Sequence, residues 1–151
     1  MVSASEWYLN SGCSQHMTCV KGDYVTYKKL ESPIDVRLAD KSVVLAVGVG
    51  NVRIVIFDND REVPVEFRNV LYVPRLKKRL LSISEMTNSG AEVKFKGDIC
   101  SILINQKNYA IGHKHGKLWK LNNEETCLLF WKQRLDRFNL MASEIWSPKS
   151  Q

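Results

Sequence analysis

One stretch near the N-terminus holds the residues best placed to do chemistry. Asn10-Ser11-Gly12 is a polar triplet typical of a tight turn, and it directly follows the apolar run Trp7-Tyr8-Leu9. An apolar run before such a triplet predicts a strand that ends in a turn. The amide of Asn10 can donate and accept hydrogen bonds there, but it cannot take up a proton at neutral pH.

A second set of reactive side chains follows in the same segment. Cys13, His16 and Cys19 have the spacing C-x-x-H-x-x-C, and their side chains are ligand types that suit zinc. No nearby residue completes a set of four ligands, so we expect no metal and no other cofactor. His113 and His115 flank a lysine in a glycine-bounded turn, where we expect exposure to solvent.

Alternating apolar and polar residues predict the strands that must position the turn. Breaks are expected at Ala39-Asp40-Lys41-Ser42, at Gly48-Val49-Gly50-Asn51 and at Asp58-Asn59-Asp60. The pattern indicates a meandering antiparallel sheet with short connections. Besides the opening strand, the predicted strands cover residues 34–38, 43–47, 52–56, 63–67, 69–73, 93–95, 99–104, 109–111 and 118–121.

Two segments are predicted to be helical. Ser82-Ile83-Ser84-Glu85 fits a capping box and Gly90 suits the position after a helix end, which predicts a short helix over residues 83–89. Further along, apolar residues recur at helical spacing and predict an amphipathic helix with an unpartnered stripe. We expect a β domain over residues 5–122, this helical segment over residues 123–146 and a flexible tail over residues 147–151.

Length and composition are those of one ordinary globular domain with a small appendage. The chain has 151 residues, of which 44% are hydrophobic and 25% charged. The net charge of +6 would allow weak attraction to nucleic acid, but no aromatic motif accompanies the basic cluster Arg75–Arg79, which favours a solvated loop. No apolar run is long enough for a membrane span and no signal core is visible, so we expect an intracellular, cytoplasmic protein without membrane contact.

Several separated motifs together resemble the retropepsin-like aspartic protease region in Pol polyproteins of copia-type LTR retrotransposons. The first segment, WYLNSGCSQHM, resembles the family's W-x-L-D-S-G-A-S-x-H-M. A tail segment, Phe130–Arg137, resembles the L-W-H-x-R-L-G-H that opens the GAG-pre-integrase segment. The other matches, in the family's order, are Arg37–Asp40 with L-A-D, Gly48–Gly50 with G-x-G, Asn69–Pro74 with V-L-Y-V-P and Leu80–Ser82 with N-L-L-S.

This resemblance implies a mostly β fold, a retropepsin-like closed β-barrel with one short helix that works as a homodimer on extended polypeptides. Asn10 stands at the position of the family's catalytic Asp. Ser11 would hydrogen-bond the residue at position 10, and Gly12 would let the backbone turn closely beneath it. Gly48, Val49 and Gly50 would form the tip of a substrate-binding flap, although an ordinary hairpin turn also explains these glycines.

The same resemblance implies a site that has lost its acid. Two adjacent carboxylates share one proton, so that one acts as a base toward water, whereas Asn10 would place an amide in both protomers. The family's zinc histidines also fall on Lys132 and Arg137, which cannot replace imidazole ligands. We therefore expect an inactive fragment of a retrotransposon Pol polyprotein that resembles an aspartic endopeptidase. The alternative is a non-catalytic peptide-binding or dimerisation module derived from such a protease.

Overall fold

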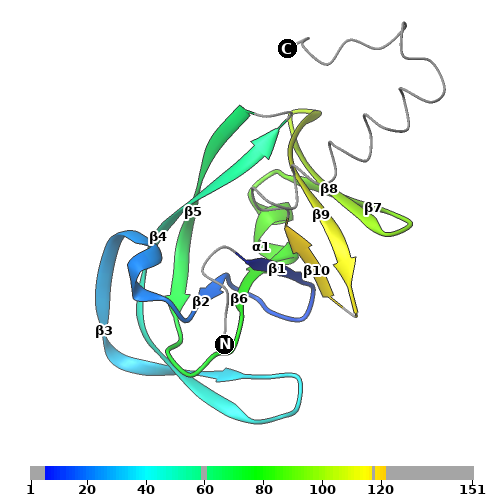
Figure 1. Cartoon of the computed structure of the whole chain (residues 1–151). Helices are drawn as coiled ribbons and strands as arrows, with labels where there is room; N and C mark the ends of the chain where they lie inside the picture. The colour runs from blue at the N-terminus through cyan, green and yellow to red at the C-terminus, as the bar shows by residue number, and fades with distance from the viewer. Residues whose placement is uncertain (1–5, 59–60, 117, 122–151) are drawn as a thin grey trace, which may run out of the picture.

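The structure is a computed structural model that describes residues 6–58, 61–116 and 118–121 (Figure 1). The helix and tail predicted beyond residue 122, together with Lys132, Arg137 and Cys127, lie outside the described residues. In chain order the elements are β1 (Trp7–Asn10), β2 (Met17–Thr18), the 3-10 helix η1 (Lys21–Asp23), β3 (Tyr24–Arg37), β4 (Val43–Asp58), β5 (Arg61–Tyr72), β6 (Arg79–Ser82), α1 (Ile83–Asn88), β7 (Glu92–Lys96), β8 (Ile99–Ile104), β9 (Lys107–His115) and β10 (Leu118–Leu121).

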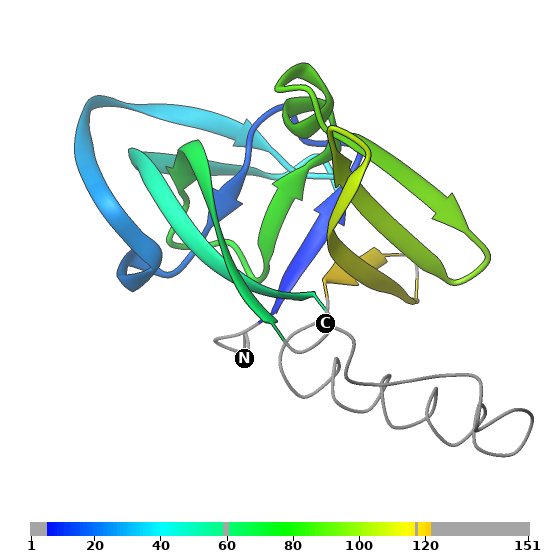
Figure 2. The ribbon, with the colours of Figure 1, turned by 90° about the horizontal axis from the view of Figure 1, so that it is seen from above.

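The described residues are mostly β, as predicted, and their ten strands form one mixed sheet in the order β3-β4-β5-β2-β6-β1-β10-β9-β8-β7. The β1–β6 and β2–β5 pairs are parallel and the other pairs are antiparallel. The predicted closed barrel is not formed, because β3 and β7 end the sheet without pairing with each other. Instead, the β4–β5 hairpin bends across the sheet (Figure 2), and β4 approaches β9 without joining it.

The strands β1 and β6 separate two hydrophobic clusters and are buried on both faces. Alternate side chains of β1 enter different clusters: Trp7 and Leu9 pack in one, and Tyr8 packs in the other. In β6, Leu81 and Leu80 divide in the same way. Such parallel, doubly buried strands need continuous apolar runs, which explains the sequence WYL before the Asn10 turn.

The glycines predicted to form a turn lie instead in the middle of one long strand, β4. Gly50 faces Tyr27 of β3 on one side and Val70 of β5 on the other. A side chain at Gly50 would overlap the carbonyl oxygen of Thr26, and one at Gly48 would overlap the Tyr27 ring. These positions therefore need glycine for close approach of a neighbouring strand rather than for a turn.

Two local predictions are confirmed: the turn at residues 39–42 and the helix start at Ser82. Between β3 and β4, Oδ1 of Asp40 accepts a hydrogen bond from the backbone N–H of Ser42 at 2.9 Å. At the start of α1, the hydroxyl of Ser82 accepts the backbone N–H of Glu85 at 3.1 Å, as an N-cap should. Gly90 follows the helix with a φ of 98°, which favours glycine.

Candidate functional site

The Asn10 turn follows β1 directly and lies beside the end of β6. The parallel register places Asn10 opposite Ser82. Asn10 is half-buried, whereas Ser11 and Gly12 are exposed. The backbone N–H of Gly12 donates to Oδ1 of Asn10 at 2.6 Å, which closes an Asx turn. The hydrogen bond between Ser11 and the residue at position 10, which the resemblance implied, stays a prediction.

Ser82 connects this turn to the helix and to the loop that follows the turn. Its hydroxyl donates to the carbonyl oxygen of Cys13 at 2.7 Å while it caps α1. Its backbone N–H donates to Nδ1 of His16 at 2.9 Å. The sequence indicated Ser82 only as a helix cap, because its partners at positions 13 and 16 are distant in the chain. Three hydrogen bonds at one buried residue therefore fix the segment after Asn10 against β6 and α1.

His16 is a buried, neutral imidazole in this arrangement. The side chain is 4% exposed, and its ring meets that of Phe67 edge-on with centroids 5.1 Å apart. Burial lowers the pKa of His16 to about 4. Because Nδ1 accepts from Ser82, the proton of the neutral ring lies on Nε2.

The buried imidazole makes the stability of the protein depend on pH. The folded pKa, about 4, is below the ordinary value of 6.5, so the unfolded chain binds more protons between these values. The stability that neutral His16 contributes is complete above about pH 6.5 and is lost as pH falls toward 4, by about 3 kcal/mol. Urea unfolding of the protein and of His16→Asn, which keeps an acceptor near Ser82, checks this prediction. An equally steep decline in both proteins would contradict it.

The C-x-x-H-x-x-C segment does not bring its three residues together as a metal centre. Within the described residues there is no group of three or more His, Cys, Asp or Glu side chains that could hold a metal ion. Burial raises the pKa of the thiols of Cys13 and Cys19, which keeps them protonated at neutral pH. His113 and His115 lie in β9 rather than in the predicted turn; the first is half-buried and the second exposed.

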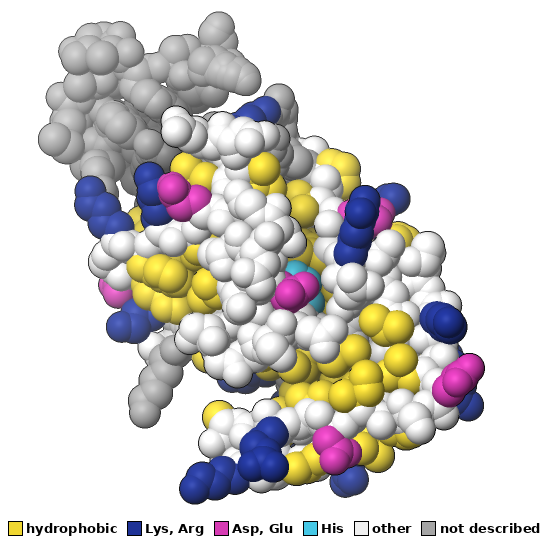
Figure 3. Space-filling model, turned by 180° about the vertical axis from the view of Figure 1, so that it is seen from behind, with side chains coloured by type: hydrophobic (Ala, Val, Ile, Leu, Met, Phe, Trp, Pro, Cys, Tyr) yellow, Lys and Arg dark blue, Asp and Glu magenta, His cyan; other side chains and the backbone are white. Residues whose placement is uncertain are grey.

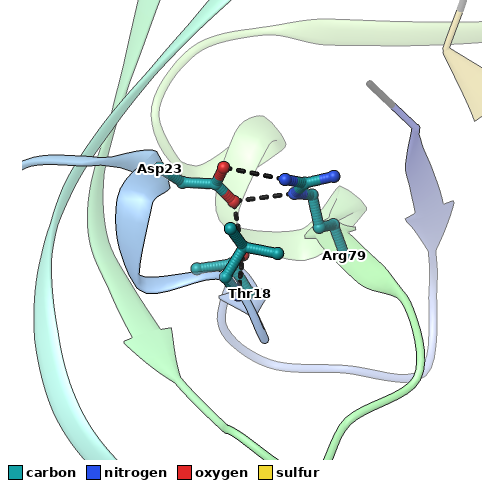
Figure 4. Close-up of polar contacts among 4 residues, drawn as sticks. Thr18, Asp23 and Arg79 are labelled. Atoms are coloured by element: carbon teal, nitrogen blue, oxygen red, sulfur yellow. Dashed lines mark hydrogen bonds and ion pairs between the residues drawn. The ribbon is translucent and has the colours of Figure 1, made fainter. Parts of the chain in front are cut away.

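A buried ion pair that the sequence did not reveal stands beside the same strands (Figure 4). Arg79 is 1% exposed, and its Nε and Nη2 donate to the two carboxylate oxygens of Asp23 at 2.7 and 2.9 Å. The buried hydroxyl of Thr18 donates to the same carboxylate. The interpretation of Arg79 as part of a solvated basic loop is therefore wrong. The pair holds η1 against the start of β6, where Arg79 lies opposite Trp7 of β1.

The segment predicted as a flap is separate from the hairpin tips. Gly48, Val49 and Gly50 are paired to strands on both sides, whereas the β3–β4 hairpin turns at residues 38–42. Leu38 at that tip packs on the same hydrophobic cluster as Cys13. The tip and the segment after Asn10 thus share one cluster.

None of the helices in the described parts of the chain has the length and apolar character needed to cross a bilayer.

Comparison with known proteins identifies a family whose model matches this chain. A family model described as "Pol polyprotein, beta-barrel domain" matches residues 7–91, which include the Asn10 turn and α1. The retrovirus-related Pol polyprotein from transposon RE1 of Arabidopsis thaliana is 28% identical over 94 residues, which are 62% of this chain. The alignment covers 6% of that relative's own length. No solved structure matches the chain.

Proposed function

The chain belongs to the family of Pol polyprotein β-barrel domains, and from this premise we propose that it is a protease-derived module of a retrotransposon Pol polyprotein that has lost its catalytic acid. The match covers more than half of the chain and includes every residue of the Asn10 turn. The peptidase ancestry itself rests on the motifs around that turn. The activity of the much longer relative is not carried over to this chain.

The observation that carries this proposal is the Asn10 amide in its turn. Its Oδ1 is held by the Gly12 N–H, so the side chain is fixed at the end of β1 where the family's acid would stand. A carboxylate at this position could accept a proton from water, and an amide cannot. If two protomers brought their Asn10 turns together, the site would have the shape of a peptidase site but no group to act as a base toward water.

The first prediction from this proposal is that the protein cleaves no peptide. Incubation with extended apolar peptides at mildly acid pH should give no product, because neither protomer contributes an ionisable group at position 10. Mass spectrometry of the protein must accompany the assay, since deamidation of Asn10 would create a carboxyl group. Turnover by fully amidated protein that disappears in Asn10→Ala would overturn the proposal.

A non-catalytic binding or dimerisation module is the second candidate, and the surface of the β3–β4 hairpin favours it. Val43 and Leu45 are about half exposed on β4, and their partners Arg37 and Asp35 lie on β3. Because β3 ends the sheet, its outer edge can still pair. Hydrophobic side chains are also exposed in patches on the face shown in Figure 3. In this second proposal the β3–β4 hairpin closes over a bound peptide, and the β4 segment Gly48–Gly50 supports the hairpin.

A peptidase-like site shared by two protomers requires a second copy of the chain, and an isolated protomer leaves the apolar face at Val43 and Leu45 exposed. We expect sedimentation to show a homodimer at micromolar concentration or above. Leu45→Lys should weaken the dimer at least about tenfold by placing a charge on that face, and Val55→Lys, at an equally exposed β4 position, serves as the control. A protein that stays monomeric at millimolar concentration would exclude a shared site.

A further inference from the structure

A pocket separate from the Asn10 turn lies between β5, α1, β8 and β10. Its volume is about 470 Å³, and neither Asn10 nor the two residues after it line it. This volume is within the usual range for small-molecule sites. The apolar part of its wall consists of Val65, Phe67, Met86, Ala91, Ile102, Ile104 and Leu121.

Within the part of the chain that the structure describes, one polar group of the pocket wall has no hydrogen-bond partner. His16 lines the pocket and uses Nδ1 to accept the Ser82 N–H, so its remaining donor is Nε2–H. None of the described residues accepts a hydrogen bond from Nε2. An unsatisfied buried donor is unfavourable, and the His16 side chain is only 4% exposed. The pocket therefore offers this buried donor beside the apolar part of its wall, which matches a ligand with an apolar body and one acceptor.

The charges at the pocket indicate that this ligand is neutral. Two carboxylates, those of Glu66 and Glu85, line the pocket together with one guanidinium, that of Arg68. Arg53 lies 3.9 Å from the Glu66 carboxylate on the exposed side of the hairpin, which offsets part of this negative charge. No excess of positive charge remains to pair with an anionic ligand, and burial of an unpaired anion is unfavourable.

We propose that this pocket binds a small neutral molecule with an apolar body and a carbonyl oxygen, and that the oxygen accepts a hydrogen bond from Nε2–H of His16. The apolar body would pack between Phe67 and Met86. This binding goes beyond the function proposed for the Asn10 turn and does not depend on it, because the two sites share no lining residue. A result against binding in this pocket would therefore not count against the function proposed for the Asn10 turn, and the reverse also holds.

The probe for this proposal is benzylacetone, a neutral aromatic ketone, and its carboxylate analogue hydrocinnamate is the matched anion. In NMR titrations of the whole chain, benzylacetone should give saturable shifts of the His16 Nε2–H proton and the Met86 methyl group, with a Kd below about 1 mM. Hydrocinnamate should bind at least about tenfold more weakly. Absence of saturable shifts in the folded protein, or equal binding of both compounds, would overturn the proposal.

Two substitutions test the hydrogen bond and the pocket separately. His16→Asn keeps an acceptor for Ser82 but removes the Nε2 donor, and should weaken benzylacetone binding about tenfold. Ala91→Phe places a ring in the pocket wall and should abolish binding, whereas Asn88→Phe, at an exposed helix position outside the pocket, should leave it unchanged. NMR dispersion shows that each variant is folded. Unchanged binding in folded Ala91→Phe would place the ligand elsewhere and refute the proposal.

Discussion

Asp23→Ala is expected to lower the free energy of unfolding by about 3–5 kcal/mol, because it leaves the Arg79 guanidinium buried without its counter-ion. Arg79 is held by two hydrogen bonds to Asp23, and the side chains are 1% and 15% exposed. Thr18 would lose its acceptor at the same time. The ring of Trp7 lies 5.8 Å from the guanidinium and would stay beside it. Loss of this one carboxylate should therefore loosen η1, β2 and β6 together.

Urea unfolding followed by tryptophan fluorescence measures this effect. The matched control is Glu66→Ala, which removes the carboxylate of the exposed pair with Arg53; those side chains are 56% and 38% exposed and 3.9 Å apart. An exposed pair contributes less than about 1 kcal/mol. A double variant, Asp23→Ala with Arg79→Met, should recover part of the loss, because it removes the unpaired charge. Equal effects of Asp23→Ala and Glu66→Ala would show that the buried pair is not organised as described.

Local patterns in the sequence were sufficient to predict the helix start and parts of most strands, but not β2 or β6. Alternating apolar residues mark β4 and β5, and the Ser82–Glu85 cap lies within four residues, so both signals are complete in a short window. The continuous run WYL before Asn10 has a physical reason that only the fold shows, since β1 is buried on both faces. The family resemblance identified the Pol polyprotein region, which the family match confirms.

Features that depend on partners far along the chain could not be predicted. Gly48 and Gly50 have the composition of a turn, and only the approach of Thr26 and Tyr27 shows that they serve a strand. Arg79 belongs to a basic cluster in sequence, but its counter-ion lies 56 residues earlier. Likewise, after the opening strand the next strand was predicted only from residue 34, whereas β3 begins at Tyr24, because β4 supplies its hydrogen-bond partners.

Asn10→Asp is expected to have the largest effect on activity, from no cleavage to measurable cleavage. The change replaces an amide with a carboxyl group of the same shape, and the Gly12 N–H can still donate to it. In the proposed dimer, two such carboxyl groups would repel each other, which raises one of their coupled pKa values and makes the pair share a proton. A base of this kind contributes roughly 100-fold or more to the rate. We also expect Cys13→Ala to help, because Ala is the residue of the family's motif at this position; the change removes the hydrogen bond that the Cys13 thiol donates to the Asn10 carbonyl oxygen at 3.7 Å.

The most direct test of the account is the cleavage rate of an extended apolar peptide by the double variant Asn10→Asp with Cys13→Ala, measured beside the native chain from about pH 4 to 7, where a proton-sharing pair works. Far-ultraviolet circular dichroism and sedimentation show that both proteins are folded and dimeric. We predict no product with the native chain, and with the double variant a rate that is highest below neutrality. A folded, dimeric double variant that binds the peptide and cuts none of it would contradict the claim that the turn lacks only its acid, and would leave the binding module as the function.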